Sequence, residues 1–478
     1  MSNTAQTLAG KRIAALLDEN SFVEIGGSIT ARNTDFNMAK ADTPADGVIT
    51  GYGVIDGSLV YVYSQDASVL GGTIGEMHAK KITGIYDLAM KMGAPVIGLI
   101  DCAGLRLQEA TDALNAFGAI YEKQALASGV IPQITAVFGT CGGGLAIVPG
   151  LTDFTFMEEK NAKLFVNSPN ALDGNTKEKC DTASAKFQSE EAGLVDFVGS
   201  ESDVLAGIRQ LVGMLPANNE DDMSYEECAD DLNRVCADLA NCVGDTSILL
   251  GQIADDNVFV ETKAAYAKEM VTGFLRLNGQ TVGAVANRTE VYDAEGNKTD
   301  AFDAVLTKKG AVKAAEFVQF CDAFGIPVLS LTNVKGFKAN MHSERGIAKA
   351  VAKLTYAFAN ATVPKVNVVI GAAYGSAYVA MNSKAIGADM TYAWPTAEIG
   401  TMDAKLAAKI MYADADAATM NEKAAEYAAL QTSAASAAKR GYVDAIIDAC
   451  DTRKYVIGAF EMLFTKREDR PAKKHGTV

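Results

Sequence analysis

Two glycine-rich stretches are candidates for chemistry that uses backbone groups. One runs from Gly139 to Gly144 and the other from Gly371 to Ala377, and each lies between an apolar run typical of a buried strand and an apolar helical stretch. Small residues let a ligand approach the backbone closely. The first N–H groups of a helix have no partner inside it and lie at the positive end of its dipole. Two adjacent N–H groups aimed at one point would stabilise an oxyanion such as an enolate.

Two simpler interpretations of these stretches also have to be weighed. Glycine can be needed only because a helix packs closely on a strand, although finding such a stretch twice favours a functional site. A phosphate cradle is disfavoured, because neither stretch contains Gly-x-Gly-x-x-Gly and neither is followed by Gly-Lys-Ser/Thr.

The two stretches belong to an internal repeat. The segment from Gly93 to Val96 returns as Gly325 to Val328, and Gly139 and Gly143 return at the same spacing. Upstream blocks return at slightly different spacings, which indicates insertions in loops. Blocks that persist in the same order over this length predict two copies of one fold.

Each copy is predicted to contain a hairpin, a helix, a strand, a second helix and a second strand. Asp56-Gly57 and Asn278-Gly279 mark the hairpin turns. The continuous apolar strands, separated by helices, indicate α/β packing with strands buried on both faces. We expect an N-terminal domain over 1–215, an acidic linker with one surface helix over 216–245, and a C-terminal domain over 246–478. The predicted helices cover 77–92 and 311–324, and the predicted strands cover 96–100, 328–331, 133–138 and 365–370.

Composition excludes several classes of function. The 478 residues include 43 Lys and Arg against 59 Asp and Glu, a net charge of −16 that disfavours nucleic acids and anionic lipids. The eight cysteines form no Cys-x-x-Cys pair, so we expect no metal site and reduced thiols in a cytoplasmic protein. Because Met1 to Lys11 is polar, we expect no signal peptide, and because the longest apolar stretch, 366–381, is short and interrupted, we expect no direct membrane insertion.

Three motifs together carry a family resemblance. They are Glu76 to Ile82, the first glycine-rich stretch followed by Leu151 to Phe154, and Trp394 to Ile399. The sequence resembles the carboxyltransferase subunit of biotin-dependent acyl-CoA carboxylases, a group that includes propionyl-CoA carboxylase beta, methylmalonyl-CoA decarboxylase alpha and transcarboxylase subunits. This resemblance implies two tandem crotonase-like domains, of the ClpP/crotonase superhelix type, and assembly into a hexamer.

The resemblance also implies a site. The amides of Gly143 and Gly144 would hold the thioester enolate, and those of Ser376 and Ala377 the carbonyl oxygen of the biotin ureido ring. Acyl-CoA would lie on the N-terminal domain, and biotin would enter from the C-terminal domain of a partner subunit. Residues implied on the substrate side are Gly71, Gly72, Thr73, Ala103, Gly104, Leu105, Gly142 and Val379, and those on the biotin side are Gly336, Phe337, Tyr374 and Gly375.

The implied reaction moves a carboxyl group between biotin and a short acyl-CoA of the propionyl/methylmalonyl or acetyl/malonyl type. The cofactor supplies the base, so no catalytic side chain is needed, and the three histidines, His78, His342 and His475, have no evident nucleophile beside them. Biotin would arrive on a separate carrier protein. A biotin carboxylase or a membrane decarboxylase subunit would be a further partner and would decide the direction of the reaction.

Several residues depart from the family pattern and keep two other functions open. Ala103, Lys335 and Ser376 stand where relatives have glycine, proline and glycine, and Val379 stands where many have an aspartate beside the substrate pocket. One alternative is a biotin-independent crotonase-type hydratase or isomerase. The other is a catalytically silent scaffold paralogue.

Four further features have simpler interpretations. The stretch from Ala89 to Met92 matches the biotin-attachment tetrapeptide, but we expect Lys91 to be a cation at a helix end. We expect Arg106 with Glu109, and His342 with Glu344, to be solvated surface pairs. The acidic 220–231 segment should be a solvated face, and the alanine-rich 404–411 and 424–438 segments should be packed helices, with a subunit contact as one option.

Overall fold

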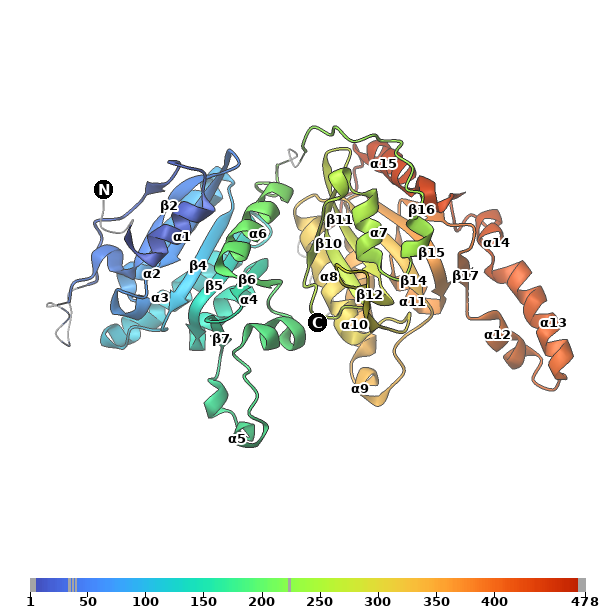
Figure 1. Cartoon of the computed structure of the whole chain (residues 1–478), viewed down its shortest axis with the longest axis horizontal. Helices are drawn as coiled ribbons and strands as arrows, with labels where there is room; N and C mark the ends of the chain where they lie inside the picture. The colour runs from blue at the N-terminus through green and yellow to red at the C-terminus, as the bar shows by residue number, and fades with distance from the viewer. Residues whose placement is uncertain (1–5, 33–35, 37, 39–40, 222–224, 472–478) are drawn as a thin grey trace. The chain divides into compact units, whose positions relative to one another are not determined.

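The computed structural model describes residues 6–32, 36, 38, 41–221 and 225–471. The chain forms two compact units, Met1–Ser224 and Tyr225–Val478 (Figure 1). Among the described residues no helix is both long and apolar enough to cross a membrane.

The first unit is built on an eight-stranded sheet. The strand order is β1-β2-β3-β4-β5-β6-β8, and β7 pairs with the end of β5. The β1–β2 and β2–β3 pairs are antiparallel, and the remaining pairs are parallel. The strands are β1 (Val23–Glu24), β2 (Val48–Ile55), β3 (Ser58–Gln65), β4 (Val96–Cys102), β5 (Gln133–Gly142), β6 (Phe154–Glu158), β7 (Lys163–Phe165) and β8 (Phe197–Gly199).

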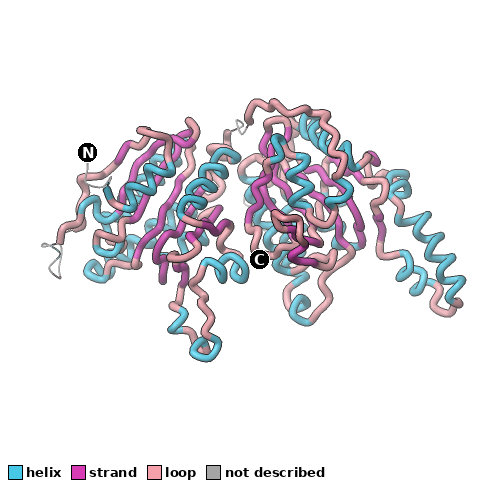
Figure 2. Tube along the Cα trace, in the orientation of Figure 1, coloured by secondary structure: helices cyan, strands magenta, loops and turns pink. Residues whose placement is uncertain are grey.

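Helices cover this sheet on both faces. Val96 and Ile100 of β4 belong to the core beneath α2 and α3, whereas Ile97 and Leu99 are out of phase with them and point the other way. All four side chains are buried, so the predicted burial of the strands on both faces is confirmed. Figure 2 shows the helices that lie beside the strands. The helices are α1 (Leu8–Leu16), α2 (Glu76–Met92), α3 (Ala110–Ala127), α4 (Ile147–Leu151), α5 (Asn175–Glu178) and α6 (Glu201–Met214).

The second unit repeats this architecture. Its sheet order is β18-β16-β15-β14-β11-β10-β9, and β17 pairs with the end of β15. The β9–β10 and β10–β11 pairs are antiparallel and the rest of this sheet is parallel, as in the first unit. The strands are β9 (Phe259–Thr262), β10 (Met270–Leu277), β11 (Gln280–Asn287), β14 (Val328–Val334), β15 (Lys365–Tyr374), β16 (Met390–Ala393), β17 (Glu398–Gly400) and β18 (Ala445–Ile446), with β12 (Glu290–Tyr292) and β13 (Lys298–Ala301) forming a separate ribbon.

The helices of the second unit complete the correspondence. A core cluster under the sheet includes the single tryptophan, Trp394, which is 1% exposed. The helices are α7 (Thr246–Ile253), α8 (Lys308–Ala323), α9 (Met341–Glu344), α10 (Ile347–Asn360), α11 (Gly375–Ala380), α12 (Ala404–Met411), α13 (Ala417–Tyr427), α14 (Ala434–Lys439) and α15 (Thr452–Leu463).

Both predicted hairpins are confirmed. Asp56 and Gly57 have φ angles of 47° and 81°, and Asn278 and Gly279 have 52° and 78°. A two-residue turn with both φ angles positive matches the twist of the strands it joins, and Asp-Gly and Asn-Gly adopt it readily. The duplication is therefore visible in the turns as well as in the sheets.

The predicted strands before the glycine turns are correct in place but too short. Strand β5 continues through Gly139 to Gly142, and β15 continues through Gly371 to Tyr374. The reason is a late partner in each unit: β7 pairs with Gly142, and β17 pairs with Tyr374. Small residues therefore extend the sheet instead of leaving it.

The acidic segment differs from the expected linker. Its described part contains a 3-10 turn at Leu239–Cys242 and not the predicted surface helix. Leu239 and Cys236 are buried in the core of the second unit. Asp230 pairs with Arg234 and with the buried Arg453, so the expectation of a purely solvated acidic face was wrong for this residue.

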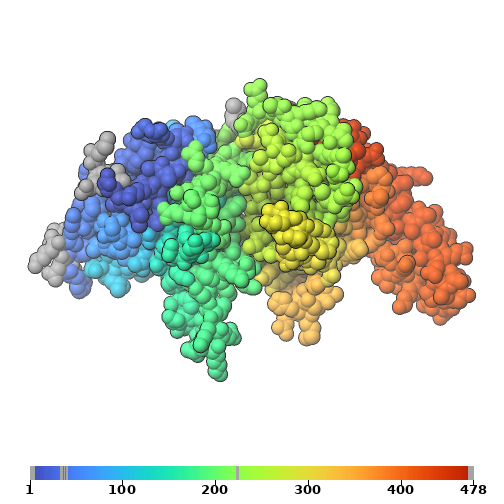
Figure 3. Space-filling view, viewed as in Figure 1, coloured from blue at the N-terminus to red at the C-terminus, as the bar shows by residue number. Residues whose placement is uncertain are grey.

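Two segments extend away from their sheets. In the first unit the strand β7 leads into a loop that carries α5, which Figure 3 shows as a protrusion. In the second unit α12 and α13 pack against each other and lie away from the sheet (Figure 1). The helix predicted over 404–411 is confirmed as α12, whereas the segment predicted as a helix over 424–438 is divided among the end of α13, a π-helical turn at Ala428–Thr432 and α14. A subunit contact there stays a prediction.

Candidate functional site

The first glycine turn begins where β5 ends. Gly143 has a φ angle of +65° and starts a 3-10 turn, Gly143–Ala146, that leads into α4. A Cβ at Gly143 would have no atom within 4 Å. Glycine is therefore required here by the backbone conformation, and the space next to it is open.

The second glycine turn has the same construction. Gly375 has a φ angle of +60° and starts α11 directly after β15. Ser376 and Gly144, which occupy equivalent positions of the repeat, are both exposed, whereas Ala377 is buried. The amide pair predicted in the second copy, Ser376 with Ala377, thus starts one position later than the pair predicted in the first. In both copies the N–H groups that start the helix lack partners within it.

The residues predicted on the acyl-CoA side come together in the first unit. The Ala103 N–H donates to the Gly71 carbonyl over 2.9 Å, and the Ile74 N–H donates to the Gly104 carbonyl over 2.9 Å. A Cβ on Gly104 would lie 3.8 Å from the Gly142 carbonyl oxygen, which places these segments beside the first glycine turn. Thr73 and Leu105 lie within the same two paired segments.

Gly72 in this group tolerates no side chain. Its φ angle is +64°, and a Cβ there would lie 2.4 Å from the Asp101 carbonyl oxygen. The close approach fixes the Gly71–Thr73 segment against the end of β4. Of the predicted substrate residues, only Val379 lies elsewhere, half-buried on α11 of the second unit.

The residues predicted on the biotin side lie at or just after the ends of two neighbouring strands of the second unit, β14 and β15, which pair Val334 with Ala373. The Leu306 N–H donates to the Gly336 carbonyl over 2.9 Å, and Leu306 bridges to Phe337 as Ile74 bridges to Leu105. Phe337 is 38% exposed. Tyr374, at the end of β15, donates its hydroxyl to the Glu398 carboxylate, and burial followed by this hydrogen bond raises the Tyr374 pKa. The phenol is therefore neutral and fixed.

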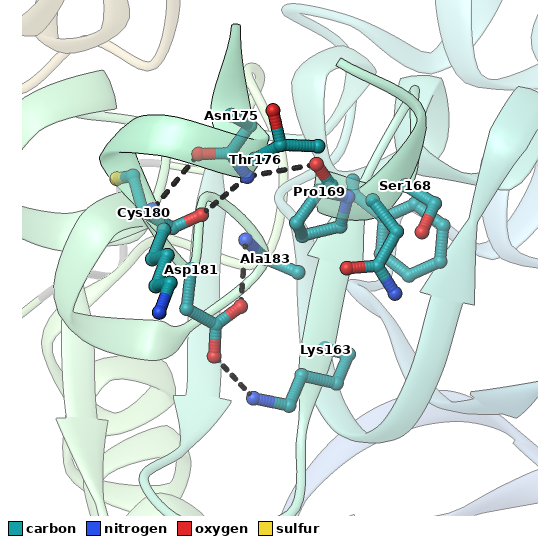
Figure 4. A pocket seen from close by; sticks show the side chains of 11 residues that line it. Lys163, Ser168, Pro169, Asn175, Thr176, Cys180, Asp181 and Ala183 are labelled. Carbon is teal, nitrogen blue, oxygen red and sulfur yellow. Dashed lines mark hydrogen bonds and ion pairs between the residues drawn. The ribbon is translucent and has the colours of Figure 1, made fainter.

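A cavity of about 640 Å³ lies between β7 and the loop that carries α5, and none of the predicted site residues lines it. Its wall includes Phe165, whose ring packs so closely on Gly142 that a Cβ there would lie 2.8 Å from the Phe165 Cζ atom. The Asn175 side chain holds the loop wall through the backbone of Pro169 and Cys180, at 2.7 to 2.9 Å, as Figure 4 shows. Sequence analysis missed this wall, because Asn175 and its partners follow no recognisable spacing.

The Arg106–Glu109 pair is not a solvated surface pair, as was expected. Both side chains are fully buried, and a second carboxylate, Asp46, completes the group. The Arg106 Nη1 atom lies 2.7 Å from the Asp46 Oδ1 atom and 2.8 Å from the Glu109 Oε1 atom. Burial raises the Asp46 pKa, and the Arg106 charge opposes this shift. The expectation was wrong because Asp46 lies far upstream, before β2, and no local sequence pattern predicts its contact with Arg106.

The histidine nearest this group is inert. His78 is completely buried, and burial together with the Arg106 charge lowers its pKa to about 3, so its ring is neutral. Its Nδ1 atom lies 2.9 Å from the Asp46 carbonyl oxygen, and its Nε2 atom lies 3.2 Å from the Gln65 Nε2 atom. Within the described residues, no set of three His, Cys, Asp or Glu side chains is grouped to hold a metal ion.

Known proteins match this chain along nearly its whole length. The sequence matches the family described as the carboxyl transferase domain over residues 3–478. It is 40% identical to the methylmalonyl-CoA decarboxylase alpha subunit of Veillonella parvula, covering 98% of this chain and 92% of that protein. It is also 40% identical to the propionyl-CoA carboxylase beta chain of Roseobacter denitrificans, covering 98% and 93%. The chain belongs to the carboxyl transferase family.

A solved structure confirms the fold of this carboxyltransferase. The transcarboxylase 12S structure, described as a hexamer with hydrolysed methylmalonyl-CoA bound, superposes with a TM-score of 0.91 at 37% identity, covering 99% of this chain and 93% of that one. The predicted α/β fold with two tandem crotonase-like domains is confirmed. The chain is an acyl-CoA carboxyltransferase of the biotin-dependent group.

The residues of this carboxyltransferase suit a cofactor that brings its own base. Gly143 leaves open space where a side chain would stand, whereas a Cβ at Gly375 would lie 3.2 Å from the Thr401 carbonyl oxygen, and the helix-start N–H groups beside both glycines are donors. Lys91, in the tetrapeptide that matches a biotin-attachment site, lies in the last turn of α2, which ends at Gly93 in the left-handed conformation. Lys91 therefore sits on a helix, as expected, and not on a hairpin turn.

Proposed function

We propose that this carboxyltransferase moves a carboxyl group between biotin on a carrier protein and a short acyl-CoA of the propionyl/methylmalonyl type. Relatives named for both compounds cover the chain almost completely, which supports this substrate class over acetyl/malonyl-CoA. Bound biotin would supply both the carboxyl group and the base. The chain itself has to bind, orient and polarise the two reactants.

We assign one glycine turn to each reactant. The amides of Gly143 and Gly144 hold the thioester oxygen as it becomes an enolate, and those of Ser376 and Ala377 hold the ureido oxygen. Gly71 to Thr73 and Ala103 to Leu105 line the acyl-CoA side, with Gly142. Gly336, Phe337, Tyr374 and Gly375 line the biotin side, and Val379 borders the acyl group.

One observation carries this assignment. The two units place a glycine with φ near +60° at equivalent positions, between a long strand and the first turn of a helix. Fixed N–H donors of this kind stabilise a developing oxyanion without reorganising during the reaction. A single turn could serve helix packing alone, but two equivalent turns match a reaction with two oxygen atoms to polarise.

The partners follow from the same assignment. Acyl-CoA and a biotin carrier protein are the expected reactants. We propose a hexamer, because the transcarboxylase 12S relative is described as one. A biotin carboxylase or a membrane decarboxylase subunit would complete the system and set the direction of the reaction. We expect the protein to work in the cytoplasm.

The first experiment combines substrate and cofactor. The purified protein is mixed with free biotin and, in separate reactions, malonyl-CoA, methylmalonyl-CoA and glutaconyl-CoA, and decarboxylated acyl-CoA is followed by mass spectrometry. We expect biotin-dependent product, with methylmalonyl-CoA as the best substrate. Product without biotin would favour the hydratase or isomerase type of enzyme, and binding without any product would favour the silent scaffold.

A substitution then tests the amides. Gly144→Pro removes one N–H at the second position of a 3-10 turn, where proline is tolerated. Loss of one oxyanion donor lowers turnover by about 100- to 1000-fold. Gly144→Ala keeps the N–H and is the matched control, although its Cβ would lie 3.1 Å from the Tyr121 hydroxyl. Equal activities of the two variants would contradict the assignment.

A further inference from the structure

A buried ionic group lies directly beneath the proposed acyl-CoA segment. Arg106, Asp46 and Glu109 have side chains with 0% exposure. Two neighbouring side chains contact the backbone of the turn that carries Asp46. Lys81 donates to the Ala45 carbonyl over 2.8 Å, and the neutral His78 contacts the Asp46 carbonyl. Ionic groups at this depth are expensive to desolvate and are weak contributors to stability.

The remaining N–H groups of Arg106 donate to Thr73, in the segment that is assigned to acyl-CoA. Its Nη2 atom donates to the Thr73 carbonyl over 2.7 Å, and its Nε atom lies 3.4 Å from the Thr73 hydroxyl. The Thr73 hydroxyl in turn donates to the Leu70 carbonyl over 2.8 Å. A planar guanidinium with several directed donors fixes geometry better than a single ammonium. Arg106 therefore holds the shape of the segment from Leu70 to Thr73.

Glu109 connects the ionic group to the start of helix α2. Its Oε2 atom accepts from the Glu76 N–H, at the start of α2, over 2.6 Å. A Cβ on Gly75 would lie 2.4 Å from the Glu109 Oε1 atom, so glycine is required there for the carboxylate to fit. The ionic group thus ties together the Pro44–Gly47 turn, the Gly71–Thr73 segment and the start of α2.

At the positions equivalent to Arg106, Glu109 and Asp46, the described part of the second unit has no such group. By the spacing that relates Gly143 to Gly375, Lys338 is the equivalent of Arg106, and it pairs with Asp303 at the surface, with both side chains more than 40% exposed. Met341 replaces Glu109 at the same spacing. By the spacing that relates the two hairpin turns, Lys268 replaces Asp46. The duplicated scaffold therefore forms without this group, which points to a role in the first site.

We infer that Arg106 is a positioning residue that sets the affinity of the site for acyl-CoA. It acts through the Gly71–Thr73 segment and does not touch the reacting atoms. This inference rests on the proposed function, because that function assigns the segment to acyl-CoA. The expected result is a rise in KM and Kd for the CoA esters with no comparable change in KM for biotin.

The experiment compares Arg106→Lys and Arg106→Met with the wild-type enzyme. KM is measured separately for methylmalonyl-CoA and for free biotin, and the Kd of propionyl-CoA is measured by titration calorimetry. We expect KM and Kd for the CoA esters to rise by about tenfold or more, because the segment loses the charge-assisted hydrogen bonds that fix it. KM for biotin should stay within about twofold, and lysine, with its single cation, should restore part of the affinity.

Two further variants separate positioning from folding. Arg453 is an equally buried arginine of the second unit, paired with Asp255 over 2.7 Å, and Arg453→Met should lower the folded fraction without changing any KM. Glu109→Gln keeps the size of the side chain and is used if the Arg106 variants do not fold. It should raise the same Kd by a smaller factor.

The outcomes distinguish this inference from the proposed function. If the wild-type enzyme has no biotin-dependent activity, the function fails, while calorimetry with propionyl-CoA still tests Arg106. An unchanged Kd and KM, with kcat falling only as the folded fraction falls, would overturn the inference. So would an equal rise of KM for both reactants.

Discussion

The two units share a backbone but differ in the polar groups beneath it. Both contain a hairpin with a two-residue turn, a long strand, and a glycine with positive φ at the start of a helix. Both also contain a buried lysine at equivalent positions: Lys81 donates to the Ala45 and Val48 carbonyls, and Lys313 donates to the Lys263 and Tyr266 carbonyls. Only the first unit has the Arg106 group.

This difference separates what the fold needs from what each site needs. The lysines satisfy backbone carbonyls in the turns before β2 and β10, and buried carbonyls without donors are costly in either unit. Arg106 instead braces a segment assigned to one reactant. The buried lysines that donate to backbone carbonyls are therefore present in both units. The Arg106 group, which lies beside the segment assigned to acyl-CoA, is present only in the first.

The largest expected effect tests whether the two glycine turns are functionally equivalent. Ser376→Pro removes an N–H in the first turn of α11, where proline is tolerated. We expect turnover with biotin to fall by about 100- to 1000-fold. The Kd of propionyl-CoA should change much less, because only Val379 of the residues assigned to acyl-CoA lies in the second unit. Turnover is followed by mass spectrometry and the Kd by calorimetry.

Ser376→Ala is the matched control for that substitution. Because the backbone N–H is retained and the hydroxyl has no assigned role, activity should stay within about threefold of wild type. If Ser376→Ala were as inactive as Ser376→Pro, the hydroxyl and not the amide would be the functional group. The two turns would then polarise their reactants by different means.

A second test concerns stability. Arg106→Met leaves Asp46 and Glu109 buried without their cation, which costs about 3–5 kcal/mol, and should increase hydrogen exchange in β4 and α2. Lys338→Met, at the equivalent position, removes only an exposed pair and should leave the unfolding of the second unit almost unchanged. Trp394 fluorescence reports that unfolding, because the only tryptophan lies in the second core. Similar losses in the two variants would contradict the difference between the units.

A third test uses pH to compare the buried lysines. Burial lowers the pKa of Lys313 to about 7 and that of Lys81 to about 8, from 10.5. Between the folded and unfolded pKa values, unfolding takes up a proton, so stability rises with pH across that interval and levels off below the folded value. Between pH 7 and 8 this linkage operates mainly for Lys313, with a slope of up to about 1.4 kcal/mol per pH unit. The charged groups that face Lys313 are Glu261, Glu269, Arg288 and Lys263.

The measurement is urea unfolding at pH 7.0, 7.5 and 8.0. Lys313→Met should flatten the rise in stability of the second unit, read from Trp394 fluorescence, and should lower stability overall because two carbonyls lose their donor. Lys81→Met should leave that rise in place. An equal pH dependence in wild type and Lys313→Met would show that other groups carry it.

The sequence was sufficient for the scaffold and for the proposed reactive backbone groups, but not for their supports. Apolar runs, Asp-Gly and Asn-Gly turns, and glycines at one spacing are local signals, and each predicted element of the two sheets was found within a few residues. The Arg106 group depends on Asp46, which is distant in sequence, and the cavity wall depends on Asn175 contacts with backbone atoms. Tertiary packing brings these residues together, and their spacing in the sequence follows no pattern from which the contacts could be predicted.

The smallest expected effect concerns the end of the first long helix after the hairpin in each unit. Helix α2 ends in a tetrapeptide that matches a biotin-attachment site, whereas α8 ends in Asp322-Ala323 and has no such motif. Lys91 is exposed in the last turn of α2, where a cation interacts favourably with the helix dipole. Lys91→Ala should therefore change stability by only about 0.3 kcal/mol. It should leave turnover with free biotin unchanged.

Coexpression with a biotin ligase makes this test decisive. A biotin-attachment lysine has to be presented on a turn that the ligase can reach, and a lysine fixed in a helix that runs into the αL glycine Gly93 and a buried strand is not presented in this way. Wild type and Lys91→Ala should both give no streptavidin signal. A signal in wild type that Lys91→Ala removes would mean that the chain carries its own biotin, and the separate carrier would no longer be required.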